Sequence, residues 1–196
     1  MSSEPTDEQL VEAVRRGDHR VAGLLYDRVV GSVERALFRV LGRREPDHDD
    51  LVQAVFEQIV LTLTRRSYVQ ACSLKTWASS IAGHVALNTI RRRRVERKIL
   101  DRRAVVDPQS VRARGDVEAT AAARIELDRV RHKLATLPIE QSQTLLLHDI
   151  LGHRLAEIAV MMNVPVVTAQ TRLSRGRRRL LHRLEEKPTA RRGARV

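Results

Sequence analysis

The sequence predicts an all-α fold of two small helical domains joined by a linker, and three observations support this class. Apolar residues recur every three or four positions along most of the chain. Aromatic residues make up only 3% of the sequence, and a core of Leu, Val, Ile and Ala suits packed helices better than sheets. The helical spacing is lost at residues 100–121, which divides the 196 residues into two parts of small-domain size.

The first domain, residues 1–99, is expected to hold four helices. Asp7 opens a short helix that Gly17 ends, and Asp18 caps a longer helix that Gly42 ends. The apolar stripe of this second helix is Leu25, Val29, Val33 and Leu37. The stripe of the third helix is Leu51, Val55, Ile59 and Leu63, and Asp49 or Asp50 is expected to be its N-cap.

A polar stretch at residues 65–73 shows no period and is expected to be a loop. The fourth helix then starts near Leu74, turns Trp77 into the core and runs into Arg91–Arg94. The linker follows at residues 100–121, where turn-forming Asp, Pro, Gly and Ser residues interrupt the pattern.

The second domain, residues 122–187, is predicted to end in a helix-turn-helix. The first helix of this motif is Leu155–Met162, and the second is about Val167–Leu184. Asn163 can take the left-handed conformation that the tight turn needs, and Thr168 can cap the second helix. A basic tail at residues 188–196 is expected to be disordered.

The second helix of this motif separates apolar from basic residues. At 100° per residue, one face is Ala169, Leu173, Gly176, Leu180 and Leu184. The opposite face is Thr171, Arg175, Arg178 and His182, with Arg172 to one side. Residues 172–183 include six arginines and no acid, which costs helix stability and calls for a polyanionic partner. Such a helix suits the major groove of DNA, although a solvated basic helix is the alternative.

The charge of the whole chain agrees with a nucleic-acid partner. The formal net charge is +12 and the pI is about 11.2. Residues 1–64 hold 8 basic and 12 acidic residues, a net charge of −4, whereas residues 65–196 hold 28 basic and 12 acidic residues, a net charge of +16. This asymmetry predicts two different partner surfaces.

Several classes of function lack their signatures. The single cysteine, Cys72, cannot form an internal disulfide or a paired-cysteine zinc site. No leader and no apolar run near the ~20 residues of a membrane span is present, so we expect a cytoplasmic protein without membrane insertion. His148 and His153 do not share a helical face for a metal, and no phosphate-binding loop or pair of catalytic carboxylates is found. We expect no enzyme activity, cofactor or metal.

Three stretches resemble the extracytoplasmic-function group of the sigma-70 family of bacterial RNA polymerase sigma factors. Asp47–Phe56 resembles the acidic-then-apolar signature of sigma region 2, and Lys75–Arg94 resembles the segment that follows it. Leu155–Arg175 resembles sigma region 4. The resemblance covers nearly the whole chain apart from the linker and tail. It implies that the two domains are regions 2 and 4 of a transcription-initiation factor.

The resemblance also implies partners and site residues. The residues that would bind the β′ clamp helices of core RNA polymerase are Asp47, Asp50, Gln53 and Phe56. Region 4 would meet the β flap, and an anti-sigma factor is a further partner of this group. A capped core helix is the plain alternative for the Asp47–Phe56 signature.

Promoter DNA is the other implied partner. The specificity loop for the −10 element would be Arg66, Ser67, Tyr68 and Gln70, with Tyr68 as a stacking aromatic. Phosphates near the melted region would be held by Arg91, Arg92, Arg93 and Arg94. The −35 element would be read by Thr168, Thr171, Arg172, Arg175 and Arg178. An ordinary surface loop and a solvated charge run are the alternatives for the first two sets.

Some positions depart from the family pattern. Ala54 stands where glutamate is common, Gly83-His84 where an arginine-asparagine pair is common, and Val167 where glycine is common. Two other functions therefore stay open. One is a helix-turn-helix regulator that binds DNA unaided, and the other is a sigma-like interaction protein that does not melt promoters.

Overall fold

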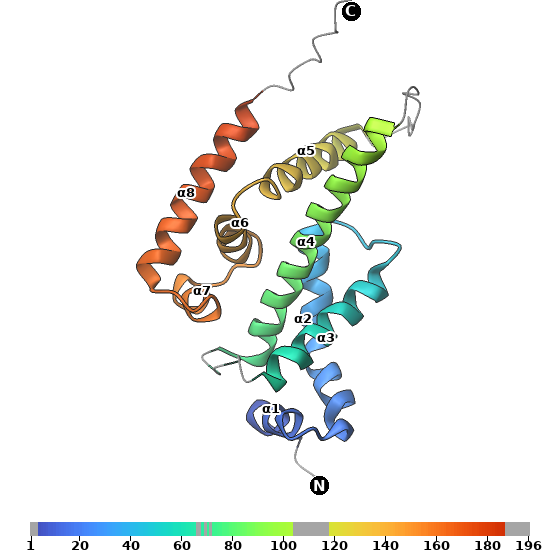
Figure 1. The fold of residues 1–196 in the computed structure, drawn as a ribbon, viewed down its shortest axis with the longest axis vertical. Helices are drawn as coiled ribbons and strands as arrows, with labels where there is room; N and C mark the ends of the chain where they lie inside the picture. Colours follow the sequence, from blue (N-terminus) through green and yellow to red (C-terminus); the bar gives the residue numbers. More distant parts are fainter. Residues whose placement is uncertain (1–3, 66–67, 69, 71, 104–117, 187–196) are drawn as a thin grey trace, which may run out of the picture.

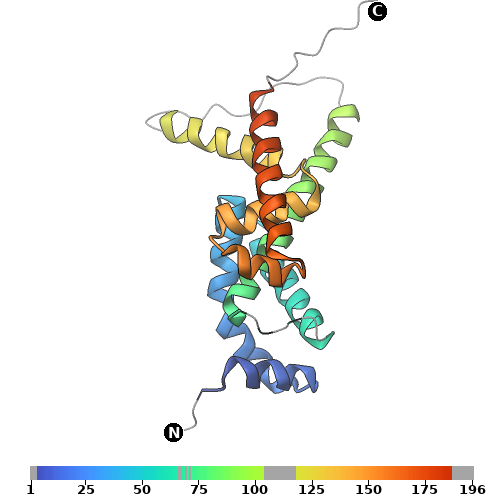
Figure 2. The same cartoon turned by 90° about the vertical axis from the view of Figure 1, so that its left-hand side faces the viewer.

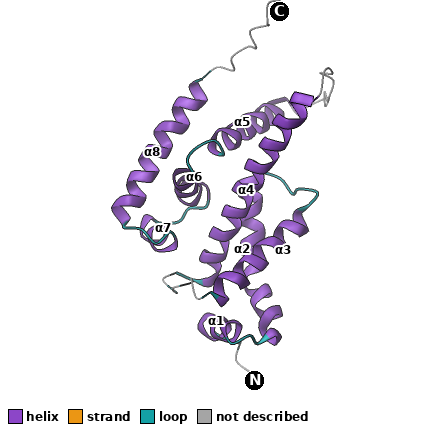
Figure 3. Ribbon diagram, viewed as in Figure 1, coloured by secondary structure: helices purple, strands orange, loops and turns teal. Residues whose placement is uncertain are grey.

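The computed structural model of the chain describes residues 4–65, 68, 70, 72–103 and 118–186. Within these residues every regular element is helical (Figure 1, Figure 3), which confirms the predicted all-α class. The α-helices are α1 (Asp7–Arg15), α2 (Ala22–Leu41), α3 (His48–Thr64), α4 (Leu74–Arg103), α5 (Glu118–Leu134), α6 (Ile139–Leu145), α7 (Leu155–Met161) and α8 (Val166–Glu185). A 3-10 turn (His19–Val21) precedes α2, and a π-helical turn, η2 (Leu146–Ile150), continues α6.

Helices α1 to α4 form the first domain, in which α2 lies against α4 (Figure 1). The predicted apolar stripes of α2 and α3 are buried, and so is Trp77, as expected. Asp7 ties three helices together, because its carboxylate accepts hydrogen bonds from the Leu74 amide at 3.2 Å and from Arg28 Nη1 at 2.7 Å. The amide of Leu74 is one of the unpaired donors at the start of α4, so this contact also caps that helix.

Two boundaries of this domain differ from the sequence prediction. The N-cap of α3 is Asp47, not Asp49 or Asp50, which lie in the first turn. All three carboxylates favour a helix start, so the local sequence does not choose among them. Helix α4 continues to Arg103, past the predicted domain end at residue 99. Residues 104–117 of the predicted linker lie outside the described residues.

Helices α5 to α8 form the second domain and contain the predicted helix-turn-helix, α7 and α8. The turn between them places Asn163 at φ 50°, which confirms its left-handed conformation. Helix α8 begins after Pro165, so Thr168 lies inside the first turn and is not the cap. The predicted apolar face holds α8 in place, with Ala169, Leu173 and Gly176 buried. The predicted tail, 188–196, lies outside the described residues.

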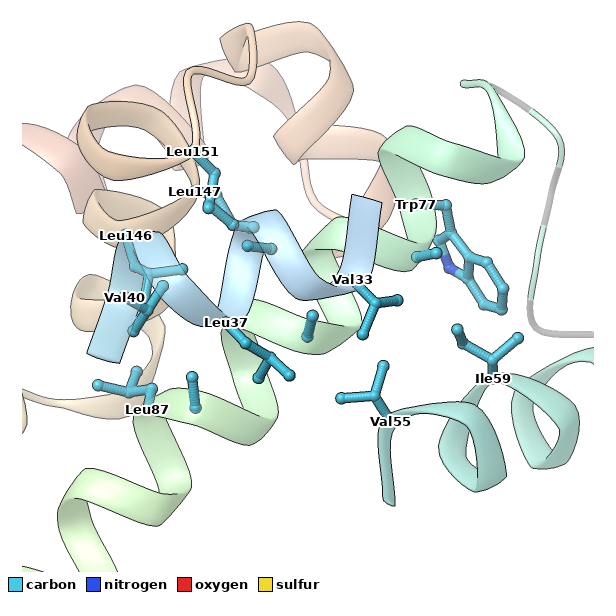
Figure 4. Packing of buried hydrophobic residues seen from close by; sticks show 14 of the residues in the cluster. Val33, Leu37, Val40, Val55, Ile59, Trp77, Leu87, Leu146, Leu147 and Leu151 are labelled. Carbon is cyan, nitrogen blue, oxygen red and sulfur yellow. The ribbon is translucent and has the colours of Figure 1, made fainter. Parts of the chain in front are cut away.

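The two domains pack on each other (Figure 2), and one apolar core runs through both (Figure 4). Leu146 and Leu147 of η2 and the following Leu151 approach α2 and α4 from the second domain (Figure 4). Gly83 allows this approach, because a Cβ at that position would lie 2.6 Å from Leu146 Cδ2 and 2.9 Å from Leu151 Cδ1. We call the contact of α2 and α4 with residues 131–153 the interdomain seam.

Candidate polymerase and nucleic-acid interfaces

The arginines of α8 divide into two sets. Arg175 and Arg178 are exposed on the face opposite the buried Leu173, as the sequence predicts. Thr171 is exposed as well, and its hydroxyl donates to the Val167 carbonyl at 2.8 Å. Thr168 and Arg172 are half-buried, and Arg172 faces the groove between the two domains. The outward face of α8 is therefore cationic. Its first residue, Thr171, lies more than one turn after the start of the helix at Val166.

The other arginines of α8 are used inside the domain. Arg177 Nε donates to Asp149 Oδ2 at 2.9 Å, and Arg179 Nη1 donates to Gln141 Oε1 at 3.1 Å. This hydrogen bond from Arg177 lowers the pKa of Asp149 below its ordinary value. Arg183 donates to the hydroxyl of Thr136. These contacts tie α8 to Thr136, α6 and η2, and leave the face that carries Arg175 and Arg178 for a partner.

Two further exposed polar residues of α8 were not singled out from the sequence. Gln170 and Ser174 are both exposed, next to Thr171 and Arg175. A glutamine amide can bind the N6 and N7 edge of adenine in the major groove. Both residues could have been found from the sequence, because they are polar and lie in the first turns of the predicted second helix of the helix-turn-helix.

The acidic start of α3 is partly exposed. Asp50 and Gln53 are exposed one turn apart, and Gln53 Nε2 donates to Glu57 Oε1 at 3.0 Å. Glu57 extends this polar face and was missed by the sequence analysis. Phe56 is half-buried, with its ring edge-on to Tyr26 at 5.5 Å between centroids.

Asp47 differs from its neighbours, because it is held by its own chain. Arg93 Nη2 donates to both carboxylate oxygens of Asp47, at 2.8 and 3.1 Å. Arg93 Nη1 also lies 3.0 Å from Glu45 Oε1, and the Glu45 side chain is only 6% exposed. We call Glu45, Asp47 and Arg93 the carboxylate clasp. Asp47 therefore joins α3 to α4 in this structure, and its side chain is 36% exposed, so its contact with polymerase stays a prediction.

The expected −10 loop is described only in part. Arg66 and Ser67 lie outside the described residues, and Gln70 is exposed with φ 55°. Tyr68 is only 5% exposed. Its hydroxyl donates to the Cys72 carbonyl at 2.6 Å, and its ring centroid lies 4.6 Å from that of Trp77. Burial raises the pKa of Tyr68 to about 12. Tyr68 is a core residue here, which corrects the expectation of a ring open to base stacking.

The arginine run of α4 is also divided. Arg91 donates to the Ala135 and Leu137 carbonyls and to Ser142 Oγ, across the interdomain seam. Arg93 belongs to the carboxylate clasp. Arg92 is exposed and Arg94 is half-buried, and Arg92 Nε lies 3.7 Å from Glu96 Oε1. The expectation that all four arginines face a phosphate backbone is therefore wrong for this conformation.

The described residues offer no cluster of three or more His, Cys, Asp or Glu side chains that could bind a metal ion. Among these residues there is also no helix with the length and apolar character of a membrane span.

Comparison with known proteins assigns the two domains. A family model of sigma-70 region 2 matches residues 25–96, and a model of sigma-70 region 4 matches residues 127–180. The chain belongs to the extracytoplasmic-function group of the sigma-70 family. It is an alternative sigma factor, which directs transcription with RNA polymerase, and the helix-turn-helix is part of its region 4.

Two relatives extend the match over nearly the whole chain. The ECF RNA polymerase sigma factor SigW of Bacillus subtilis is 23% identical over 181 residues, covering 90% of this chain and 95% of its own. The ECF RNA polymerase sigma-E factor of Haemophilus influenzae is 27% identical over 190 residues, covering 94% of this chain and 98% of its own. Among solved structures, CnrH in complex with the cytosolic domain of CnrY matches with a TM-score of 0.51 at 24% identity. That match covers 91% of this chain and 96% of CnrH.

Proposed function

We propose that region 2 binds the clamp helices of the β′ subunit through the exposed start of α3, and that α8 of region 4 reads the −35 element in the major groove. The observation that carries this proposal is the division of the arginines on α8. Arg177, Arg179 and Arg183 are hydrogen-bonded to other residues of region 4, whereas Arg175 and Arg178 face outward. A helix anchored on one side and cationic on the other is suited to insertion between two phosphate backbones.

Chemical complementarity supports the roles of the outward groups. Arginine binds the O6 and N7 atoms of guanine with two hydrogen bonds, and also binds phosphates. We expect Arg175 to read a base because it lies nearer the start of α8, and Arg178 to bind the flanking phosphates. Thr171 and Gln170 complete the reading surface.

The polymerase contact is proposed for Asp50, Gln53 and Phe56. Asp50 and Gln53 are exposed one helical turn apart, and Phe56 adds a half-buried ring on the next turn. Acidic and amide groups around an aromatic ring form a small patch with an apolar centre and a polar rim, as protein interfaces commonly do. Asp47 contributes by fixing the start of this helix.

We further propose that Arg92 and Arg94, with Arg66, Ser67 and Gln70 of the preceding loop, bind the −10 strand and nearby phosphates. The factor would position polymerase without catalysing a reaction itself, and would act in the cytoplasm. The domain limits that we propose are 1–103 and 118–187, because α4 ends at Arg103 and α5 begins at Glu118, with the rest of the linker and the tail outside them. An anti-sigma protein that binds this factor is part of the same proposal.

A second function is favoured by the interdomain seam. A sigma-like protein that binds polymerase without melting promoters would not need Arg91 or the surface around Gly83 to be free, and both are covered here. Reconstituted run-off transcription on genomic fragments separates the two functions. Specific transcripts are expected from the sigma factor, and none from the interaction protein.

The polymerase contact is tested by pull-down of core RNA polymerase. Asp50→Lys is expected to weaken retention at least about tenfold, because it places a cation where the partner accepts an anion. Asp27→Lys on α2 is the matched control, since it makes the same charge change at another exposed aspartate of region 2. Equal retention of the two variants would contradict the proposed polymerase surface.

A further inference from the structure

We propose that Arg93 is a positioning residue for polymerase binding, which holds the start of α3 in place through the carboxylate clasp and takes no part in binding DNA. This role rests on the proposed function, because α3 is the helix proposed to bind polymerase. We call its three proposed contact residues, Asp50, Gln53 and Phe56, the polymerase face. The family pattern implies instead that Arg93 holds phosphates together with its neighbours on α4.

The start of α3 is not capped by its own N-cap side chain. Asp47 is the N-cap residue, but its carboxylate accepts no hydrogen bond from the amides of α3, all of which lie within the described residues. An aspartate at this position commonly accepts such a bond from the second or third helical residue. The Asp47 carboxylate is bound to α4 instead, where Arg93 Nη2 donates to its two oxygens at 2.8 and 3.1 Å. The start of α3 therefore depends on a residue that lies 46 positions further along the chain.

The clasp also supplies a cation to a buried acid. Glu45 is buried, and its Oε1 atom lies 3.0 Å from Arg93 Nη1 and 3.1 Å from Arg43 Nε. Arg43 is exposed whereas Arg93 is half-buried, so Arg93 is the inner of the two cations. A buried carboxylate without a cation is costly, because its desolvation is not compensated. Burial lowers the pKa of Arg93, but its interactions with Asp47 and Glu45 outweigh burial and raise that pKa above its ordinary value.

The clasp is connected to the polymerase face by backbone hydrogen bonds. The His48 amide donates to the Glu45 carbonyl at 3.1 Å. The Leu51 amide donates to the Asp47 carbonyl at 3.0 Å. Both acids of the clasp thus belong to the backbone that forms the first turn of α3, and Asp50 lies in that turn. Loss of the clasp is expected to displace Asp50, because a helix end without its cap frays.

The same contacts leave Arg93 poorly placed to hold a phosphate. Both terminal nitrogens of its guanidinium are bound to carboxylates, and a phosphate would have to displace these charge-assisted bonds. The preceding residue, Arg92, is exposed, and its Nε atom lies 3.7 Å from the exposed Glu96. Arg92 is therefore the matched control for Arg93, because it has the same charge on the same helix without the clasp.

The role of Arg93 is tested in the full-length chain by fluorescence titration with core RNA polymerase in the absence of DNA. Arg93→Ala is expected to raise the Kd for polymerase by at least about fivefold, a change within the range measured for coupled neighbouring residues. Arg92→Ala should leave this Kd unchanged within about twofold, because it removes only an exposed charge. Equal Kd values for the two variants would overturn the proposed role.

Arg93→Lys keeps the test valid if Arg93→Ala does not fold. A lysine retains a cation beside Glu45, but it lacks the fixed fork with which the guanidinium binds two carboxylates. This variant should therefore recover only part of the affinity that Arg93→Ala loses. A lysine variant that folds and binds polymerase as tightly as the wild type, while Arg93→Ala does not fold, would also overturn the role.

Two comparisons separate a positioning role from a general loss of stability. Leu87→Ala leaves a cavity in the packing of α4, because Leu87 is buried, and it should lower the urea midpoint without changing the Kd for polymerase. Asp47→Ala should have little further effect in the Arg93→Ala background, because both changes break the same contact. Equal Kd values for Leu87→Ala and Arg93→Ala, or losses that add up in the double variant, would contradict action through Asp47.

The contribution to DNA binding is measured on the assembled holoenzyme, at saturating polymerase, with a duplex over a salt series. If Arg92 binds a phosphate, Arg92→Ala reduces the slope of log K against log salt by about 0.9, and Arg93→Ala leaves the slope unchanged. A reduced slope for Arg93→Ala together with an unchanged Kd for polymerase would assign Arg93 to DNA and overturn the proposed role.

Asp50→Lys shows which of the two proposals fails. If Asp50→Lys weakens polymerase binding and Arg93→Ala does not, the proposed polymerase surface stands and only the role of Arg93 is wrong. If neither variant weakens binding, the proposed surface itself is wrong, and the role of Arg93 falls with it.

Discussion

Replacing Arg175 with alanine is expected to weaken binding to a specific duplex without weakening the fold. The Arg175 side chain is exposed on the outward face of α8, so its removal leaves no buried group unpaired. The free energy of unfolding should therefore change by less than about 0.5 kcal/mol. If Arg175 binds a guanine edge, the loss of binding free energy is about 1–3 kcal/mol, which corresponds to roughly 5- to 150-fold in Kd.

Arg177→Ala is the matched control, because it removes the same charge from the same helix. At 100° per residue its side chain points away from that of Arg175, and it is bound to Asp149. Both partners are substantially exposed, at 51% and 29% of their side chains, so this variant should lose only about 0.2–1 kcal/mol of stability. Arg177→Ala should weaken duplex binding only slightly, through the loss of weak long-range electrostatic attraction.

The assay is fluorescence anisotropy on a duplex selected by this protein from a random-sequence library, repeated over a salt series. A base contact at Arg175 is seen as an affinity loss on the selected duplex and a smaller loss on unrelated duplexes. A phosphate contact instead lowers affinity on every duplex and reduces the slope of log K against log salt by about 0.9. Equal losses for Arg175→Ala and Arg177→Ala would refute the division of the α8 arginines into outward and inward sets.

Three further predictions follow from the packing. Leu173→Ala should destabilise region 4 by about 2–5 kcal/mol in urea denaturation, because Leu173 is 4% exposed, whereas Leu181→Ala, at 61% exposure, should cost less than about 0.5 kcal/mol; similar midpoints for both would contradict the assigned core face. Asn163→Ala should cost about 1–2 kcal/mol because φ is 50° there, and Asn163→Gly should be tolerated in the same melts. Burial in the seam lowers the pKa values of His84 and His153, with Arg91 also lowering that of His84 and Glu157 opposing the shift at His153. Protonation of the two histidines thus favours separation of the domains at the seam, and the radius of gyration should rise as the pH falls below the ordinary histidine pKa of 6.5. A radius of gyration that stays constant between about pH 7.5 and 5 would count against a closed seam at neutral pH.

The features predicted correctly from the sequence depend on neighbours within one or two turns. The apolar stripe from Leu51 to Leu63, the buried face of α8 and the left-handed Asn163 all follow from spacing and local conformational preference. These signals are fully contained in the segments that form the elements. The helical fold and the position of the helix-turn-helix could therefore be predicted without knowledge of tertiary contacts.

The errors concern side chains whose partners are distant in the chain. Arg91 and Arg93 are part of a run that looks solvated. The acceptors of Arg91 lie between 44 and 51 residues away along the chain, and those of Arg93 lie 46 and 48 residues away. Tyr68 sits in a polar stretch without helical period, and its burial depends on Trp77 in the next helix. Periodicity gives no information on such pairings, because it describes one element at a time.

The carboxylate clasp has a mechanical consequence for transcription initiation. Arg93 projects from the part of α4 that bears Arg92 and Arg94, and it grips Asp47 and Glu45 at the start of α3. The ion pairs thereby fix α3, which is proposed to bind polymerase, relative to α4, which is proposed to bind the promoter strand. A movement of one of these helices is therefore expected to move the other as well.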